Sequence, residues 1–368
     1  MVKTGCKPEL GDVLFSKDGT IGRRVVVRQS DDFVVASSLI IIRPKRNLLS
    51  PNFLNRLCQS NMVAGQVDSF VKGAGLPRLS IQNLLKVFGC FPPIAEQELI
   101  ADFLDGEARK VDELVAEQQR LMELLKEKRQ AVISHAVTKG LNPRAPMKPS
   151  GIEWLGDVPA HWDVLELKRT ATIQTGVAKG KDNGSRATIS VPYLRVANVQ
   201  DGYLDLVDVA TIEIPEADLS RYTLRPGDVL MNEGGDFDKL GRGCVWNGEI
   251  EPCISQNHVF AVRPRDGLSS WVATFTGSGP AQFYFMSRSK QSTNLASISS
   301  TNLMELPLTL PPAAEREAIV SFVTEQTSKF DALAAEAQKA IDLLQERRTA
   351  LISAAVTGQM DVRKLAAA

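Results

Sequence analysis

A long segment occurs twice in this chain, and this repetition restricts the possible folds more than any other feature. The sequence "PPIAEQELIADFLD" begins at Pro92, and "PPAAEREAIVSFVT" begins 219 residues later at Pro311. Further on, 110–138 aligns without a gap with 329–357, and about half of the paired residues are identical. Two unrelated amphipathic segments would not share this many residues, so we infer an internal repeat.

The repeat also extends upstream of these segments, although more loosely. The stretch "GDVLFSKDGTIG" corresponds to "GDVLMNEGGDFDKLG", "IIIRPK" to "FAVRPR", and "LSIQNLLKVFGCFPP" to "ISSTNLMELPLTLPP". Residues 151–226 precede the second "GDVL" and have no counterpart before the first. The repeated unit is therefore long, and its second copy carries an additional front segment.

The repeated segments predict two long helices, over 95–137 and 314–356. Neither range contains proline, and apolar residues recur at steps of three and four. Each helix follows a Pro-Pro pair, which suits a first turn, and each is followed by a glycine, Gly140 or Gly358, which lets the chain leave the helix. At 1.5 Å per residue, each helix would be roughly 63 Å long.

Apolar residues that recur every seven positions indicate a coiled-coil seam on both helices. A helix of this length with one apolar stripe needs a partner, and its own copy in the same chain is the nearest candidate. We therefore expect an antiparallel pair, although either helix could also serve simply as a structural rod. The residues expected in the seam are Leu104, Val111, Leu125, Val132, Phe322, Phe330, Leu344 and Leu351.

The segments before the helices predict mixed α/β globules, because β-branched runs alternate there with Gly, Asp, Asn and Pro. The expected fold class is α+β, with two mixed α/β domains separated by two long antiparallel helices and related by a pseudo-twofold internal repeat. The expected divisions are 1–91 for a partial first domain, 92–140 for the first helix, 141–310 for the second domain, 311–358 for the second helix, and 359–368 for a tail whose "KLAAA" resembles vector sequence.

Composition narrows the class of protein. Apolar residues make up 43% and charged residues 23% of the chain, as is usual for soluble proteins, and no apolar run approaches the roughly 20 residues of a membrane span. Five scattered cysteines without a CxxC pair favour reduced thiols in the cytoplasm. The formal net charge of zero argues against tight DNA binding by the chain alone.

Motifs of catalysis are missing from the sequence. It contains no GxxxxGK[ST] phosphate loop, no HExxH and no GxSxG elbow. Three histidines make a metal site or a catalytic triad improbable, and Asp236 and Asp238 fit a turn better than a metal site. We therefore expect no active site and no cofactor.

Polar loops between the predicted strands are candidates for DNA contact, because Lys, Arg, Asn and Gln reach phosphates and base edges. The same residues would also suit ordinary solvated turns. In the second domain the candidate residues are Lys179, Lys181, Arg186, Lys239, Arg242, Asn257, Arg288, Lys290 and Gln291. In the first domain they are Lys17, Arg23 and Arg78.

The order and duplication of these motifs resemble the specificity subunit of type I restriction-modification systems. A globule ending in "TNLMELPLTLPPAAEREAI" leads to a long helix closing with "RRTALISAAVTG", and the arrangement occurs twice. The stretch "GIEWLGDVPAHWDVLELKR" (151–169) is similar to the start of that family's target-recognition domain, and "YLRVANVQDG" to one of its internal landmarks. The resemblance covers most of the chain, from Gly11 to Arg363.

The resemblance implies a function as well as a fold. Two target-recognition domains would each read half of a split double-stranded DNA sequence, with the helices setting the distance between them. Half-sites one helical turn apart lie about 34 Å from each other, which such helices can span. The helices would also dock two methyltransferase (modification) subunits, and motor-nuclease (restriction) subunits would join for cleavage.

One departure from the family concerns the first domain, which has no counterpart of 151–226. A shortened gene, a cut chain or a second polypeptide could each account for it. Apolar runs such as "FVVASSLIIIRP" would then lie open, so we expect two chains to associate as a homodimer. The alternative function is an assembly protein that binds modification subunits through the coiled coil without reading DNA.

Overall fold

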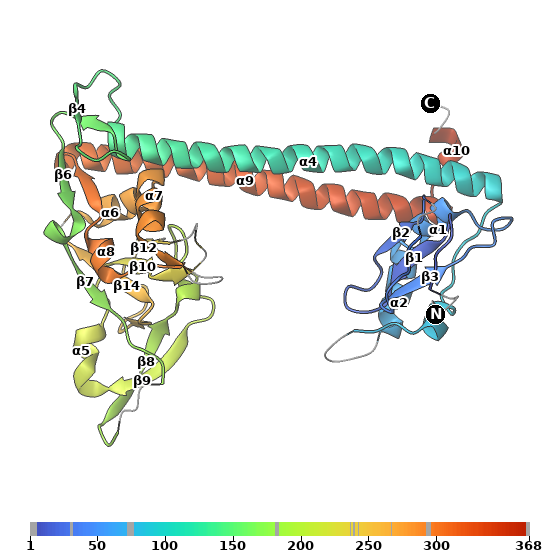
Figure 1. Ribbon diagram of the computed structural model, residues 1–368, viewed down its shortest axis with the longest axis horizontal. Helices are drawn as coiled ribbons and strands as arrows, with labels where there is room; N and C mark the ends of the chain where they lie inside the picture. The colour runs from blue at the N-terminus through green and yellow to red at the C-terminus, as the bar shows by residue number, and fades with distance from the viewer. Residues whose placement is uncertain are drawn as a thin grey trace. The chain divides into compact units, whose positions relative to one another are not determined.

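The computed structural model describes residues 6–29, 32–71, 77–180, 184–235, 237, 240–241, 243–265, 267–291 and 296–365. The chain divides into two compact units (Figure 1). Unit 1 comprises 1–122 and 334–368, and unit 2 comprises 123–333. Two long helices, α4 (Ile94–Lys139) and α9 (Ala313–Val356), therefore each contribute one segment to unit 1 and another to unit 2.

Both long helices begin and end within two residues of the predicted bounds. Each begins directly after the second residue of a Pro-Pro pair, where the missing proline N–H has no intrahelical acceptor. Gly140 and Gly358 follow their ends with φ values of +75° and +74°, a backbone conformation that glycine adopts without strain. Local sequence thus sets both ends of both helices.

Unit 1 is built on a small antiparallel sheet. Its strands β1 (Val13–Ser16), β2 (Arg24–Val26) and β3 (Leu39–Ile42) lie in the order β2–β1–β3. The helices α1 (Pro51–Leu57), α2 (Asn61–Phe70) and α3 (Ile81–Leu84) follow, and α10 (Val362–Leu365) comes after α9. Phe15, Phe53 and Leu104 are buried together with Ile352 and Val356, so the ends of both long helices complete this core.

Unit 2 contains a four-stranded antiparallel sheet in the order β12–β10–β14–β7. These strands are β12 (Gly243–Val245), β10 (Val229–Asn232), β14 (Val259–Pro264) and β7 (Ala171–Thr175). Its core contains Trp162, Trp271, Phe275 and Phe285, with the rings of Trp162 and Trp271 edge to face at 6.1 Å. The helices α6 (Ser269–Thr276), α7 (Gly279–Arg288) and α8 (Ser300–Met304) contribute to this core, together with segments of α4 and α9.

Shorter elements complete unit 2. The pairs are β4 (Met147–Pro149) with β5 (Asp157–Pro159), and β6 (Asp163–Glu166) with β17 (Pro307–Leu310). A further sheet has the order β13–β8–β9, from β13 (Ile254–Ser255), β8 (Thr188–Leu194) and β9 (Ala210–Pro215). The short helices are η1 (Leu167–Arg169), η2 (Val196–Asn198), η3 (Glu216–Asp218) and α5 (Leu219–Tyr222).

The internal repeat extends to the hydrogen bonds within each unit. In unit 1, Arg43 binds the buried Asp12 through two guanidinium nitrogens, and Arg263 binds Asp228 in the same way in unit 2. The helices α2 and α7 are capped by Ser60 and Ser278, and α3 and α8 by Ser80 and Ser299. The order β2–β1–β3 matches β12–β10–β14, and β7 is the additional strand of unit 2.

Within each unit, a segment of α4 packs against a segment of α9, and the fold class predicted from the sequence is confirmed. Leu104, Val111 and Leu125 are buried. Val132, Phe330, Leu344 and Leu351 are half-buried. Phe322 differs from the prediction: it is 37% exposed, whereas the adjacent Val323 is 6% exposed. The seam of α9 therefore passes through Val323, because one step along a helix turns a side chain to a different face.

Candidate nucleic-acid interface

Polar loops of unit 2 that are far apart in the sequence are joined by backbone hydrogen bonds. The N–H of Asn257 donates to the carbonyl of Val177 at 3.1 Å. The N–H of Glu233 donates to the carbonyl of His258 at 2.9 Å, and the N–H of Ile298 donates to the carbonyl of Glu233 at 2.9 Å. We call the described residues of 177–186, 232–243, 255–260 and 287–300 the four-loop surface.

Close backbone approaches explain why these loops meet. A Cβ atom on Gly176 would lie 2.0 Å from the carbonyl oxygen of Ser255, so only glycine permits this contact. The Tyr193 hydroxyl donates to the Val177 carbonyl at 2.8 Å and holds the same turn. The strands β11 (Gly234–Gly235), β16 (Ala296–Ser297) and β15 (Lys290–Gln291) form a small sheet that joins two further loops.

The candidate residues of unit 2 lie in different surroundings within the four-loop surface. Lys179, Lys290 and Gln291 are exposed. Arg288 is exposed, with its guanidinium carbon 5.9 Å from the centre of the Tyr284 ring. Arg186 forms an ion pair with Asp218 at 3.6 Å, so part of its charge is already balanced. Lys181, Lys239 and Arg242 lie outside the described residues.

The structure also shows the surroundings of Asn257, a candidate residue from the sequence, in a polar cluster with His258 and Glu233. The Nδ1 atom of His258 lies 2.8 Å from Oε2 of Glu233, and its Nε2 atom lies 3.2 Å from Nδ2 of Asn257. A neutral imidazole with its hydrogen on Nδ1 satisfies both contacts, because it donates to the carboxylate and accepts from the amide. His258 thereby fixes the orientation of Asn257. This pairing depends on tertiary structure, and the loop composition alone gave no signal for it.

The candidate residues of unit 1 are less free to bind a phosphate. Asp18 forms an ion pair with Lys17 at 2.8 Å and another with Arg78 at 3.6 Å. The structure thus brings Lys17 and Arg78 together around one carboxylate. Arg23 is exposed beside β2 and does not belong to this group.

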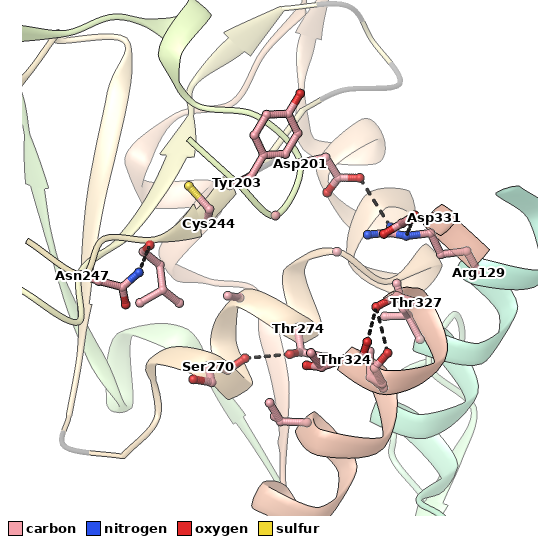
Figure 2. A pocket seen from close by; sticks show the side chains of 18 residues that line it. Arg129, Asp201, Tyr203, Cys244, Asn247, Ser270, Thr274, Thr324, Thr327 and Asp331 are labelled. Carbon is pink, nitrogen blue, oxygen red and sulfur yellow. Dashed lines mark hydrogen bonds and ion pairs between the residues drawn. The ribbon is translucent and has the colours of Figure 1, made fainter. Parts of the chain in front are cut away.

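A cavity of about 480 Å³ lies in unit 2 between the loop at Asp201, the helix α6, and the long helices (Figure 2). Arg129 of α4 reaches Asp201 at 3.7 Å and Asp331 of α9 at 3.3 Å, and Figure 2 shows its guanidinium beside both carboxylates. The arginine thus ties the globular part of unit 2 to both helices.

Two threonine hydroxyl groups of this cavity donate hydrogen bonds within their own helices. The Thr327 hydroxyl donates to the Val323 carbonyl at 2.9 Å, and the Thr274 hydroxyl donates to the Ser270 carbonyl at 2.7 Å. Neither is paired with a general base, so neither is activated as a nucleophile. The cavity therefore has the character of a structural junction.

The described residues do not supply the groups of a metal centre. Within the ranges given above, no three His, Cys, Asp or Glu side chains gather as metal ligands. Burial raises the pKa of Cys244 and of Cys253 to about 12 and that of Cys58 to about 11, so these thiols are protonated and unreactive at neutral pH. No helix among the described residues has the length and apolar character needed to cross a membrane.

Comparison with known proteins identifies relatives of this chain. Residues 5–121 match the model of the type I restriction modification DNA specificity domain. The chain is 24% identical over 324 residues to the type I restriction enzyme EcoKI specificity subunit of Escherichia coli K12, covering 87% of this chain and 68% of the relative. The StySPI specificity subunit of Salmonella potsdam is 24% identical over 323 residues, covering 87% and 67%.

Solved structures share the fold. One chain, from work on complex assembly and conformational transition of the type I R-M system, superposes with a TM-score of 0.73 at 19% identity, covering 96% of this chain and 83% of that one. The HsdS subunit of Thermoanaerobacter tengcongensis gives a TM-score of 0.52 at 18% identity, covering 98% and 84%. At these identities the similarity concerns the fold alone.

Proposed function

Because this chain belongs to the specificity subunits of type I restriction-modification systems, we propose that it selects the DNA sequence on which a methyltransferase–endonuclease complex acts. Unit 2 reads one half of a bipartite double-stranded DNA target, and unit 1 reads the other half. Catalysis belongs to the partner subunits, in the cytoplasm where the DNA lies. The observation that carries this proposal is the joining of the polar loops of unit 2 into the four-loop surface.

Different residues of the four-loop surface have different tasks in this proposal. Lys179 and Lys290 are exposed cations that bind phosphates and position the duplex. Gln291 and Asn257 carry amides that can read an adenine edge, and His258 holds the Asn257 amide in place. Arg288 can bind either a phosphate or guanine. Lys181, Lys239 and Arg242 belong to the same proposal from their sequence position only.

The two long helices provide the scaffold for the partner subunits. Leu114 and Leu333 are 45% and 53% exposed, and they occupy equivalent positions of the repeat. Leu124 and Leu343 also occupy equivalent positions, and they are 48% and 55% exposed. Exposed leucines at matching positions suit two copies of one partner, so we assign them to the two methyltransferase subunits, which motor-nuclease subunits then join.

A second function, assembly without DNA reading, is favoured by one observation. Several candidate cations are balanced by acidic residues, namely Lys17 and Arg78 by Asp18 and Arg186 by Asp218. The chain as a whole has a formal net charge of zero. A protein that only joins modification subunits would need no more cationic surface than this.

DNA binding by the chain, alone and with its methyltransferase partner, separates these two functions. The DNA-reading function predicts sequence-selective binding by the complex, measured by fluorescence anisotropy against a random-sequence competitor. The triple variant Lys179→Ala, Arg288→Ala, Lys290→Ala should lose most of this affinity while still binding the methyltransferase. If the complex forms but binds all DNA sequences equally, the assembly function is the correct one.

A further inference from the structure

The repeat allows each strand edge of unit 1 to be compared with its counterpart in unit 2. In unit 2, β6 pairs antiparallel with β17, placing Leu165 opposite Leu308. The chain then passes through η1 into β7, which lies beside β14 (Figure 1). This antiparallel pairing places Ile173 opposite Val262. One continuous stretch, Asp163–Thr175, therefore covers two strand edges, and we call it the cover segment.

Unit 1 contains both acceptor edges, and its described residues do not cover them as the cover segment does in unit 2. By the sequence repeat, 88–91 corresponds to β17, and β3 corresponds to the first part of β14. Among the described residues of unit 1, 88–91 takes part in no strand pairing, and β3 pairs only with β1. The cover segment lies within 151–226, the stretch without a counterpart in the first repeat. At both equivalent positions, no described residue of unit 1 takes the place of the cover segment.

Side-chain burial differs between the units in the same way. In unit 2, Leu303, Leu306 and Leu308 are all 0% exposed. In unit 1, the counterparts of the first two, Leu84 and Val87, are only half-buried. The neighbouring apolar side chains are largely exposed: Leu85 at 76%, Phe88 at 81% and Phe91 at 58%. An apolar patch of this kind is unusual on a surface that nothing covers.

The backbone of 88–91 has its hydrogen-bonding groups arranged as a strand partner would require. In unit 2, the N–H of Leu167 donates to the carbonyl of Leu306, so alternate residues 306, 308 and 310 face the cover segment. Their counterparts are Val87, Gly89 and Phe91. The intervening Phe88 is bound on its N–H and carbonyl by the Gln66 side-chain amide, at 2.9 and 3.0 Å. Backbone groups of successive strand residues point to opposite sides, so these bonds to Gln66 leave the N–H and carbonyl groups of Gly89 and Phe91 on the side where a further strand would pair.

Gly89 faces the core of unit 1, just as its counterpart Leu308 faces the core of unit 2. A Cβ atom on Gly89 would lie 2.8 Å from Cδ2 of Leu57, a member of the core of unit 1. The counterpart Leu308 points into the core of unit 2. The stretch 88–91 therefore turns the same position toward the core as β17 does, although no described residue pairs with it as a strand.

We propose that unit 1 is an acceptor site for an extended polypeptide segment of the cover-segment type, which adds one strand to 88–91 and another to β3. Such strand addition derives affinity from main-chain hydrogen bonds and specificity from alternate side chains. The ligand class is defined by unit 2: two short strands joined by a single turn, with apolar residues at the positions of Leu167 and Ala171, which are 0% and 7% exposed. This site does not depend on DNA reading.

The test uses the full chain and a synthetic peptide with the sequence of residues 161–177. Binding is measured by fluorescence anisotropy, and hydrogen exchange is followed by mass spectrometry, with a scrambled peptide as control. We expect 39–44 and 87–91 to exchange faster in the free chain than their counterparts 259–264 and 306–310, and to become protected by the peptide. Phe88→Asp should weaken binding about tenfold, because its counterpart Pro307 lies opposite Glu166, so the variant loses an apolar contact and places a second carboxylate opposite that glutamate.

Phe283→Asp is the matched control, because Phe283 is an exposed phenylalanine of unit 2, at 55%. It should leave peptide binding unchanged. The proposal is overturned if the peptide fails to bind, or if binding is unaffected by Phe88→Asp. It is also overturned if both edges exchange slowly in the chain alone and Phe88→Asp dissolves a dimer, since the occupant is then a second copy of the chain.

Discussion

Arg348 of α9 binds Asp112 of α4 at 2.6 Å within unit 1. The repeat-equivalent residues are Arg129 and Asp331, which form the corresponding ion pair at 3.3 Å within unit 2. Each helix therefore supplies the arginine to one pair and the aspartate to the other. The antiparallel arrangement has the same register in both units, as expected of a pseudo-twofold repeat.

This ion pair should define register more than it adds stability. The side chains of Arg348 and Asp112 are 35% and 60% exposed, so water screens their attraction. A double-mutant cycle with Arg348→Ala and Asp112→Ala should give a coupling energy below about 1 kcal/mol. A coupling of several kcal/mol, measured by urea denaturation, would contradict this interpretation.

The seam between the helices should depend strongly on Leu125. Its side chain is 7% exposed, whereas the adjacent Leu124 is 48% exposed. Leu125→Asp buries an unpaired charge and removes apolar packing, so it should lower the free energy of unfolding by about 3–5 kcal/mol. Leu124→Asp, the matched control, should change it by about 0.5 kcal/mol or less. Equal effects in urea denaturation followed by circular dichroism would show that the seam lies elsewhere.

The helices and their ends could be predicted from the sequence, and so could the loops as candidates for DNA contact, but the way in which these loops meet could not. Pro-Pro pairs, Gly140 and Gly358 act locally, so they fix helix ends without tertiary information. The meeting of Glu233 with His258 and Ile298 depends instead on hydrogen bonds between distant loops. Phe322 and Val323 show the intermediate case: both are apolar neighbours, and only packing decides which one enters the seam.

Unit 1 should become less stable in acid through Asp12. Burial alone would raise the pKa of this carboxyl, but the hydrogen bonds and charge of Arg43 outweigh burial and hold the pKa below its ordinary value of 3.8. A depressed folded-state pKa stabilises the fold above the unfolded value, and this stability is lost as the pH falls through the folded value. The loss should therefore begin near pH 4 and continue below it.

The variant Asp12→Asn isolates this contribution. It should cost about 1–2 kcal/mol at pH 7, because a charged hydrogen bond is replaced by a neutral one, and it should flatten the stability profile below pH 4. Asp32→Asn is the control, since the side chain of Asp32 is 90% exposed in its pair with Lys7. Hydrogen exchange of β1 and β3 at several pH values measures the effect, and identical profiles for both variants would contradict it.

Lys179 should contribute to DNA affinity without contributing to selectivity. Lys179 is an exposed cation to which we assign a phosphate contact. Its replacement by alanine should weaken binding to all sequences alike and reduce the salt-dependence slope by about one. Lys110→Ala on α4 is a suitable control, because Lys110 pairs with Glu107 far from the loops in sequence. A change in sequence preference on Lys179→Ala would mean that this lysine reads a base.

The most direct test of the account is selection from a random double-stranded DNA library by the complex of this chain with its methyltransferase subunits, followed by sequencing. The account predicts enrichment of two defined half-sites separated by a spacer of fixed length and free sequence. The triple variant Lys179→Ala, Arg288→Ala, Lys290→Ala should blur one half-site and leave the other intact. A single uninterrupted motif, or no enrichment by a fully assembled complex, would contradict the account.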